Sequence, residues 1–270
     1  MKKILTIAGS DSSSGAGIQA DLKTFASLGA YGTTCITALT AQNTMGVSKI
    51  ENASPAMVTA QLEAVYDDVP PDAVKTGMLA NAANAAAAAD FLAAHRGAPL
   101  VVDPVMVATS GALLLEKEAV AVYKERLFPL ASVVTPNIPE AEALTGLSIR
   151  SKDDMKAAAE AIKAWGSAAV LVKGGHLAGA AAADILLDEK GFHEFSEPWV
   201  ETKNTHGTGC TLSSALAYFL GDGWPMDEAV HMAKLYITGA LLGGIDRSVG
   251  HGHGPVDHFW SYGKAWGHLE

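Results

Sequence analysis

The strongest constraint on the fold is a regular alternation between short, continuously apolar runs and longer stretches with helical periodicity. The apolar residues of each run occupy consecutive positions, which is typical of strands buried on both faces of a parallel sheet. The alternation therefore predicts an α/β fold in which helices cover a mostly parallel sheet. Strands are predicted at residues 4–8, 33–39, 73–77, 99–105, 132–137 and 168–175, and the helices between them at residues 17–29, 54–69, 82–95, 117–128 and 152–166.

The last third of the chain decides between two architectures that share this alternation. A (β/α)₈ barrel would continue it to the end, but residues 184–201 resemble two strands joined by a tight turn at 189–191. Two further helical stretches follow at residues 207–221 and 226–244. An open sheet with an antiparallel hairpin at one edge fits this order better. The sequence contains no linker and no repeat, which predicts a single domain over residues 1–270.

The charge balance narrows the range of partners. A formal net charge of −10 argues against a nucleic-acid surface, which needs clustered Lys and Arg, but still allows a nucleotide held by backbone N–H groups. No apolar run is long enough to span a bilayer, and the apolar start at residues 4–8 is too short for a signal peptide. The two cysteines, Cys35 and Cys210, lie far apart and suggest no disulfide framework. We expect a cytoplasmic protein that binds neither nucleic acid nor membranes.

Polar and glycine residues gather directly after the predicted strands. Asp103 lies near the end of its strand, Glu140 follows the strand at 132–137, and Lys173 leads into two glycines. Because ligands of open parallel sheets bind beyond the carboxyl ends of the strands, we expect these side chains to share one edge and to form a ligand site. Asp103 and Glu140 are candidate Mg²⁺ ligands, and Lys173 is a candidate phosphate contact, although each alone is an ordinary surface residue.

Two other segments give weaker signals. The loop at residues 9–17 lacks the ending of a phosphate-binding P-loop, so it fits a plain turn as well as a ligand-contacting flap. The histidine-rich segment at residues 250–259 matches no standard zinc spacing, and we interpret it as a loop rather than a metal site.

The stretch NTHGTGC at residues 204–210 gives the strongest single signal. Its glycines let successive backbone N–H groups point at one spot, and the helix that follows adds its dipole. The stretch therefore predicts an anion hole. A plain helix cap by Thr205 or Thr208 is the alternative, and both interpretations can hold at once.

Cys210 lies where this helix should begin. A thiol at a helix N-terminus is expected to have a lowered pKa and to be reactive, whereas Cys35 fits a buried strand. A thiol protease is disfavoured, because no orienting Asn or Asp for His206 can be named with any specificity.

Together these segments resemble the hydroxymethylpyrimidine/phosphomethylpyrimidine kinases of thiamine biosynthesis, in the ribokinase-like superfamily. The resemblance covers nearly the whole chain and rests on the combination of TIAGSDSSSGAGIQADLKTF, ITALTAQNT, KTGML, VVDPVM, TPNIPEAE, KGGH, NTHGTGCTLSSA and GHGPVDHF. It implies a ribokinase-like three-layer α/β/α sandwich and a homodimer. It also implies two ATP-dependent phosphorylations in one site, which convert the pyrimidine alcohol to its monophosphate and then to its diphosphate.

The resemblance also assigns roles to individual residues. It places the pyrimidine near Gly9, Asp21, Gln42, Met78 and Val105, and Mg²⁺ and ATP near Asp103, Asn137, Glu140, Lys173 and Thr208. It makes Gly207, Gly209 and Cys210 the anion hole and the face toward the reacting hydroxyl, with Lys173 assisting catalysis. Gln42 carries both an amide donor and an acceptor, which suits the edge of an aminopyrimidine. Without the resemblance, Asp21 fits a solvated helix position equally well.

Cys210 stands where many sugar kinases of the superfamily carry an aspartate as catalytic base, and cysteine there resembles the pyrimidine kinases. Phosphoryl transfer needs little early deprotonation of the attacking oxygen, so a thiolate suffices as proton acceptor. A neutral thiol also repels an anionic monophosphate less than a carboxylate does. The serines of SDSSSGAG are a departure from relatives that often show proline or additional glycine, which bears on the flap rather than on the chemistry.

Two rival functions stay open at this point. A pyridoxine or pyridoxal kinase acts on a similar ring and hydroxymethyl group, and some such kinases also carry the cysteine. A non-catalytic protein that senses the pyrimidine is disfavoured, because Asp103, Glu140, Lys173 and Cys210 are all present.

Overall fold

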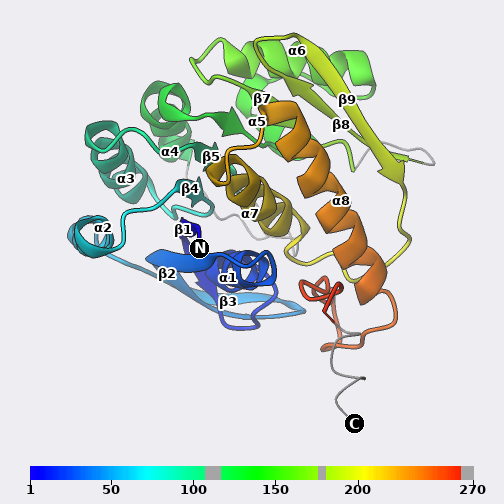
Figure 1. Ribbon diagram of the computed structural model, residues 1–270, viewed down its shortest axis with the longest axis horizontal. Coiled ribbons are helices and arrows are strands. Elements are labelled where there is room, and N and C mark those ends of the chain that lie inside the picture. Colours follow the sequence, from blue (N-terminus) through cyan, green and yellow to red (C-terminus); the bar gives the residue numbers. More distant parts are fainter. Residues whose placement is uncertain (107–116, 176–180, 263–270) are drawn as a thin grey trace.

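Nine strands form one mixed sheet in the computed structural model, which describes residues 1–106, 117–175 and 181–262 (Figure 1). The sheet order is β3-β2-β1-β4-β5-β6-β7-β8-β9. The strands from β2 to β7 in this order run parallel, and β3, β8 and β9 are antiparallel to their neighbours. The strands are β1 (Lys3–Asp11), β2 (Tyr31–Asn43), β3 (Gly46–Asn52), β4 (Ala73–Thr76), β5 (Leu100–Val102), β6 (Val133–Val134), β7 (Val170–Val172), β8 (Ala181–Leu187) and β9 (Phe192–Pro198).

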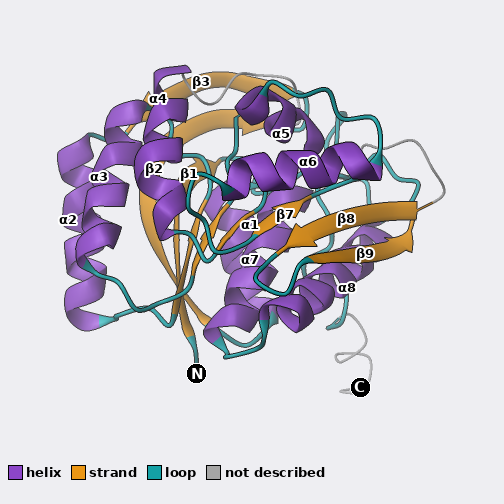
Figure 2. Cartoon of the chain, turned by 90° about the horizontal axis from the view of Figure 1, so that it is seen from above, coloured by secondary structure: helices purple, strands orange, loops and turns teal. Residues whose placement is uncertain are grey.

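Helices cover both faces of this sheet, as Figure 2 shows from above. One layer contributes α2 to α6 to a core cluster, and the other contributes α1, α7 and α8 to a second cluster on the opposite face. The helices are α1 (Gly17–Ser27), α2 (Pro55–Asp68), α3 (Ala82–Ala94), α4 (Lys117–Val122), α5 (Ile138–Thr145), α6 (Lys152–Lys163), α7 (Thr208–Gly221) and α8 (Met226–Gly244). The predicted three-layer α/β/α sandwich is therefore confirmed.

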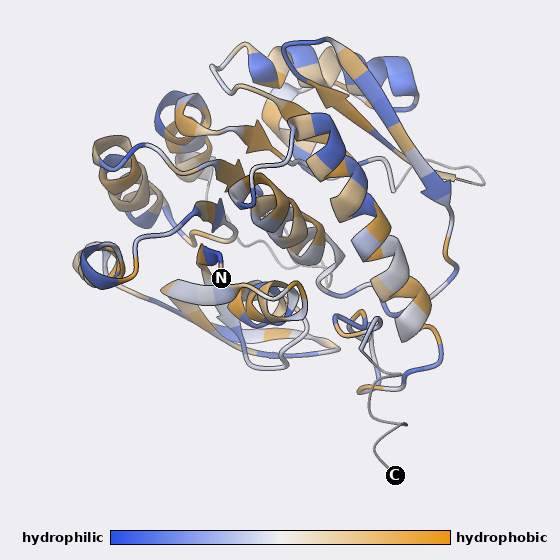
Figure 3. Ribbon diagram, in the orientation of Figure 1, coloured by the Kyte–Doolittle hydropathy of each residue, from blue (hydrophilic) through white to orange (hydrophobic). Residues whose placement is uncertain are grey.

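Burial on both faces explains the continuous apolar runs. All residues of β4, β5, β6 and β7 are buried, and Figure 3 shows hydrophobic colour on β5, β7 and α7. Removing this apolar surface from water stabilises the fold by roughly 25 cal/mol per Å². The polar edge strand β9 shows instead the alternation of a strand with one face in solvent.

The predicted edge hairpin is confirmed as β8 and β9, which pair over their full lengths from Leu187–Phe192 to Ala181–Pro198. The opposite edge differs from the prediction, because β2 turns back at its end and β3 pairs with it antiparallel. A second difference is α5, an eight-residue helix that the sequence analysis left out. The single domain over residues 1–270 stays a prediction.

The parallel strands align their carboxyl ends at one edge, and the loops after β1, β2, β4, β5, β6 and β7 meet there. Among the described residues, no helix combines the length and the apolar composition that crossing a bilayer requires. His176 of the KGGH motif lies outside the described residues.

Candidate functional site at the carboxyl edge of the sheet

Helix α7 begins at a glycine whose backbone no other residue adopts easily. Gly207 is the N-cap with φ of +81°, and a Cβ added there would overlap the Gly15 carbonyl oxygen. No side chain of the described residues caps this helix, because the Thr208 hydroxyl donates to the Thr205 carbonyl instead, at 2.6 Å. The alternative interpretation, a cap by Thr205 or Thr208, is therefore wrong. The Thr208 N–H donates to the Thr205 carbonyl at 3.2 Å, so the N–H groups that follow it, at Gly209 and Cys210, are left to face the carboxyl edge of the sheet.

A buried ion pair lies beside this helix start. Lys173 Nζ is 2.9 Å from Asp103 Oδ1, and the Ser213 hydroxyl of α7 donates to Asp103 Oδ2 at 3.2 Å. A Cβ added to Gly209 would lie 3.3 Å from Lys173 Nζ and 3.7 Å from Asp103 Oδ2. Burial raises the pKa of Asp103, but Lys173 and Lys75 outweigh it and hold that pKa below its usual value. The helix start, an amine and a carboxylate thus converge on one spot, as the strand-end pattern predicts.

Asn137 and Glu140 form a capping box at the start of α5. The Glu140 N–H donates to Asn137 Oδ1 and the Asn137 N–H donates to Glu140 Oε2, both at 2.8 Å. Asn137 also bridges in parallel to Lys173, which brings the cap to the same edge. Burial raises the pKa of Glu140 to about 7, opposed by Lys173 and reinforced by the nearby charge of Asp103.

These two carboxyl groups fit a hard cation. The negative charge of Asp103 makes ionisation of the buried Glu140 carboxyl less favourable, and the reverse holds as well. A cation bound between them would favour the ionised form of both. Mg²⁺ with nucleotide phosphates takes one or two carboxylates and keeps several waters. Among the described residues, no three His, Cys, Asp or Glu side chains group as metal ligands.

The expected low pKa of Cys210 is wrong. Burial raises the pKa of its thiol to about 11, and Asp21 and Asp103 add to this effect. Lys75 and a hydrogen bond from the Gly17 N–H lower the pKa but do not compensate. The residue as a whole is half-buried, and its thiol is protonated at neutral pH.

A small apolar wall faces the same edge. Met78 packs with Ala38, Ala80 and Val105, and a Cβ added to Gly9 would overlap the Met78 methyl group. The Thr37 hydroxyl holds the Met78 carbonyl at 2.6 Å. The structure therefore brings together three of the predicted pyrimidine contacts, namely Gly9, Met78 and Val105.

Asp21 lies deeper than the sequence analysis placed it. The alternative of a solvated helix position is wrong, because Asp21 is fully buried. Both of its carboxylate oxygens accept from Lys75 Nζ at 2.9 Å. Thr6 and Ser214 donate to it as well, at 2.6 and 2.7 Å. These bonds anchor Asp21 beneath the edge, with Cys210 and Asp103 in electrostatic range of Lys75.

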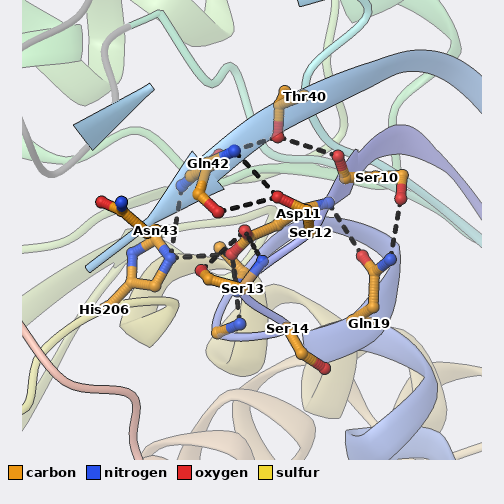
Figure 4. A network of polar contacts seen from close by, with 12 residues as sticks. Ser10, Asp11, Ser12, Ser13, Ser14, Gln19, Thr40, Gln42, Asn43 and His206 are labelled. Atoms are coloured by element: carbon orange, nitrogen blue, oxygen red, sulfur yellow. Dashed lines mark hydrogen bonds and ion pairs between the residues drawn. The ribbon is translucent and has the colours of Figure 1, made fainter. Parts of the chain in front are cut away.

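Three further side chains form a polar network at the rim, which Figure 4 shows. His206 Nε2 lies 2.8 Å from Asp11 Oδ2 and 3.3 Å from the amide of Gln42. The ring of His206 thus engages Asp11 and Gln42, which gives a thiol protease no support. Sequence reasoning missed Asp11 and His206 as site residues, although Asp11 ends β1 and both lie in glycine-rich motifs.

The histidine-rich segment at residues 250–259 is a loop, as predicted, and the structure places it at the rim. The His253 N–H donates to the Thr44 carbonyl at 3.1 Å, and the His206 N–H donates to the Gly254 carbonyl at 3.0 Å. The segment thereby joins the turn after β2 to the start of α7. Its buried His258 accepts or donates a bond with Thr211 at 3.0 Å, and burial lowers its pKa to about 4.

The carboxyl edge of the sheet does not coincide with the surface groove of the molecule. A surface groove of about 420 Å³ lies between β9 and α8, lined by residues such as Phe195, Trp224 and His231. It shares no residue with the polar cluster at the strand ends. The convergence of polar groups, rather than hollow volume, marks the candidate site.

The model of the phosphomethylpyrimidine kinase family matches residues 11–257 of this chain, which includes every group of the polar cluster. The chain belongs to this family. The hydroxymethylpyrimidine/phosphomethylpyrimidine kinase of Rhizobium meliloti is 51% identical over 96% of this chain and 98% of the relative. The thiamine biosynthesis bifunctional protein ThiED of Geobacter sulfurreducens is 54% identical over 94% of this chain, and the chain spans about half, 52%, of its length.

A solved structure extends the likeness to a second kinase of this fold. The pyridoxal kinase of Staphylococcus aureus in complex with ADP superposes with a TM-score of 0.90 at 36% identity, covering 98% of this chain and 96% of that one. The fold of the phosphomethylpyrimidine kinase family is thus shared with an enzyme whose named substrate is a pyridine.

Proposed function

We propose that this chain transfers phosphoryl groups from ATP to the hydroxymethyl group of 4-amino-5-hydroxymethyl-2-methylpyrimidine and then to the resulting monophosphate, in thiamine biosynthesis. The observation that carries the proposal is the meeting of Gly209, Lys173 and Asp103 at the uncapped start of α7. The names of the full-length relatives supply the substrate.

The backbone N–H groups at Gly207 and Gly209 suit the charge that develops on a transferred phosphoryl group. Their donors are fixed by the fold, so little reorganisation is needed when the charge appears. Lys173 adds a positive charge beside them, and its ion pair with Asp103 holds the amine in place. Thr208 and Asn137, at the starts of α7 and α5, are the remaining proposed ATP contacts.

Asp103 and Glu140 would hold Mg²⁺, which supplies charge neutralisation between the phosphates when bound. Glu140 also closes the capping box with Asn137, so replacing its carboxylate affects the backbone of this loop as well.

Cys210 faces the reacting hydroxyl in this proposal, beside the pyrimidine contacts Gly9, Asp21, Gln42, Met78 and Val105. Its thiol is neutral at physiological pH, since burial raises its pKa to about 11. A loose transition state asks for positioning more than for an early base, so the neutral thiol positions the alcohol while its hydroxyl proton leaves late, to an oxygen of the transferred phosphoryl group. It also avoids the repulsion that a carboxylate would exert on the monophosphate in the second step.

The test is the identification of products by mass after incubation with ATP, Mg²⁺ and the pyrimidine alcohol. We expect the monophosphate to appear first and the diphosphate to follow. A chain that binds the alcohol and leaves ATP unconsumed would instead be a sensor.

Pyridoxal kinase is the second candidate function, because the solved pyridoxal kinase superposes at a TM-score of 0.90. The lower identity of 36%, against 51% for the pyrimidine kinase relative, favours the pyrimidine. We further propose that the protein is a cytoplasmic homodimer built from one domain per chain.

A further inference from the structure

His206 is held so that its ring has one orientation. The ring packs on Gly15, where an added Cβ would overlap it, and the His206 N–H donates to the Gly254 carbonyl at 3.0 Å. Its Nε2 lies 2.8 Å from Asp11 Oδ2. The loop wraps Asp11 with further donors, namely the N–H groups of Ser13, Gly15 and Ala16 and the hydroxyl of Ser13.

These donors settle which partner gives the proton. Burial raises the pKa of Asp11, but the His206 and Ser13 bonds outweigh it and lower the pKa to about 2. Asp11 is therefore an ionised carboxylate that only accepts, so His206 Nε2 carries the hydrogen and donates it. A protonated Nε2 has no lone pair for a second donor.

The hydrogen on His206 Nε2 determines the orientation of the Gln42 amide. The amide end nearest His206 Nε2, at 3.3 Å, has to be the carbonyl oxygen, because two donors cannot face each other. The other end of the amide lies 3.0 Å from the Thr40 hydroxyl, which donates to the Ser10 carbonyl, also at 3.0 Å. A hydroxyl that has given its one hydrogen to Ser10 accepts from the amide nitrogen. Only this orientation avoids a donor facing a donor at His206 and gives the amide nitrogen an acceptor at Thr40.

We propose that His206 is a positioning residue that fixes the orientation of the Gln42 amide, so that the chain selects a ring with an amino donor beside a ring-nitrogen acceptor. The second lone pair of the Gln42 oxygen then accepts from the amino group, and the second N–H donates to the ring nitrogen. Pyridoxal has no such adjacent pair. The inference rests on the proposed function, because it takes the aminopyrimidine as the ligand.

The test is a double-mutant cycle read by calorimetric Kd for the aminopyrimidine alcohol, without ATP. We expect His206→Phe to raise this Kd about tenfold, since the amide loses its orientation, and to leave the Kd for ATP within about twofold. We expect Gln42→Ala to have a similar or larger effect, and the double variant to add less than about twofold to Gln42→Ala. Losses that multiply in the double variant would overturn the proposal, as would an equal loss for ATP.

A second variant and a control distinguish a specific effect on the amide from misfolding of a variant. Thr40→Val keeps the shape of the strand residue but removes the hydroxyl at the other end of the amide, so we expect it to lower the preference for the pyrimidine over pyridoxal. His231→Phe changes an exposed histidine in the groove between β9 and α8 and should alter neither affinity. An unchanged preference in both His206→Phe and Thr40→Val would refute the inference.

The two levels of the proposal fail in different ways. A wild-type chain that binds the pyrimidine but yields no phosphorylated product contradicts the proposed function and leaves the cycle readable. A wild-type chain that does not bind the pyrimidine overturns both.

Discussion

At the scale of single residues, burial outweighs the helix dipole at Cys210. Because its pKa is raised to about 11, the thiolate fraction should grow about tenfold per pH unit across pH 7 to 10. We therefore predict that alkylation of Cys210 by iodoacetamide is slow at pH 7 and still accelerates above pH 9. Peptide mass mapping of the rate against pH checks this.

Cys35 provides the internal control for that experiment. It is buried in β2, its thiol contacts the Val58 carbonyl at 3.5 Å, and burial raises its pKa to about 12. We expect it to react more slowly than Cys210 at every pH. A Cys210 rate that levels off below pH 8 would show the low-pKa thiol that the sequence alone predicts.

Whether a site residue could be predicted from the sequence depends on how far along the chain its partners lie. Asp103, Lys173 and the glycines of α7 could be predicted, because each follows a strand or opens a helix and the sheet gathers such positions. Lys75 could not, since a lysine in a buried strand makes sense only once Asp21 is known to face it across 54 residues. The rise in the pKa of Cys210 depends on the same long-range burial.

At the scale of elements, the two glycines at the start of α7 should differ in what their substitution changes. We expect Gly207→Ala to lower stability and Gly209→Ala to lower catalysis. Gly207→Ala puts a Cβ at φ of +81° and against the Gly15 carbonyl, so we expect it to lower the free energy of unfolding by about 1–3 kcal/mol. Gly209→Ala has no such strain, and its Cβ would approach side-chain ends alone, Lys173 Nζ at 3.3 Å and Asp103 Oδ2 at 3.7 Å. We expect it to cost less than about 1 kcal/mol, and yet to lower kcat at least about tenfold by intruding on the phosphate.

Urea unfolding and steady-state kinetics of the two variants decide this prediction. If Gly209→Ala keeps wild-type kcat, the space in front of Lys173 is not where the phosphoryl group passes. If Gly207→Ala is as stable as wild type, the left-handed turn does not set the start of α7.

The elements that sequence reasoning missed have identifiable causes. Strand β3 is mostly exposed and polar, so it lacks the apolar run that marks the central strands, and it forms because β2 continues to Asn43 and turns. Helix α5 is only eight residues long, and its capping box of Asn137 and Glu140 is a helix-start signal in residues whose types also suit nucleotide and metal contacts. The longer helices and the edge hairpin at β8 and β9 were predicted from periodicity and turn residues.

At the scale of the whole molecule, the buried pair of Lys75 and Asp21 ties together β4 and α1, and through Thr6 and Ser214 also β1 and α7. Lys75→Met leaves the Asp21 carboxylate buried without its cation, so we predict a loss of about 3–5 kcal/mol in the free energy of unfolding. Adding Asp21→Asn should recover part of this loss, because the uncompensated charge is removed.

Urea denaturation of these variants provides the measurement, with Lys152→Met as the matched control. Lys152 pairs with Glu194 on the surface, where loss of an ion pair costs at most about 1 kcal/mol. Equal losses for Lys75→Met and Lys152→Met would mean that the buried pair does not hold the layers together.

The most direct test of phosphoryl transfer to an aminopyrimidine at this edge is the ratio of kcat/KM for the pyrimidine alcohol to kcat/KM for pyridoxal, with Mg²⁺ and ATP in one preparation. The Gln42 amide and the family membership predict a ratio well above one, with the diphosphate as the final product. A ratio below one, or a reaction that stops at the monophosphate, would contradict the proposed function and favour a pyridoxal kinase.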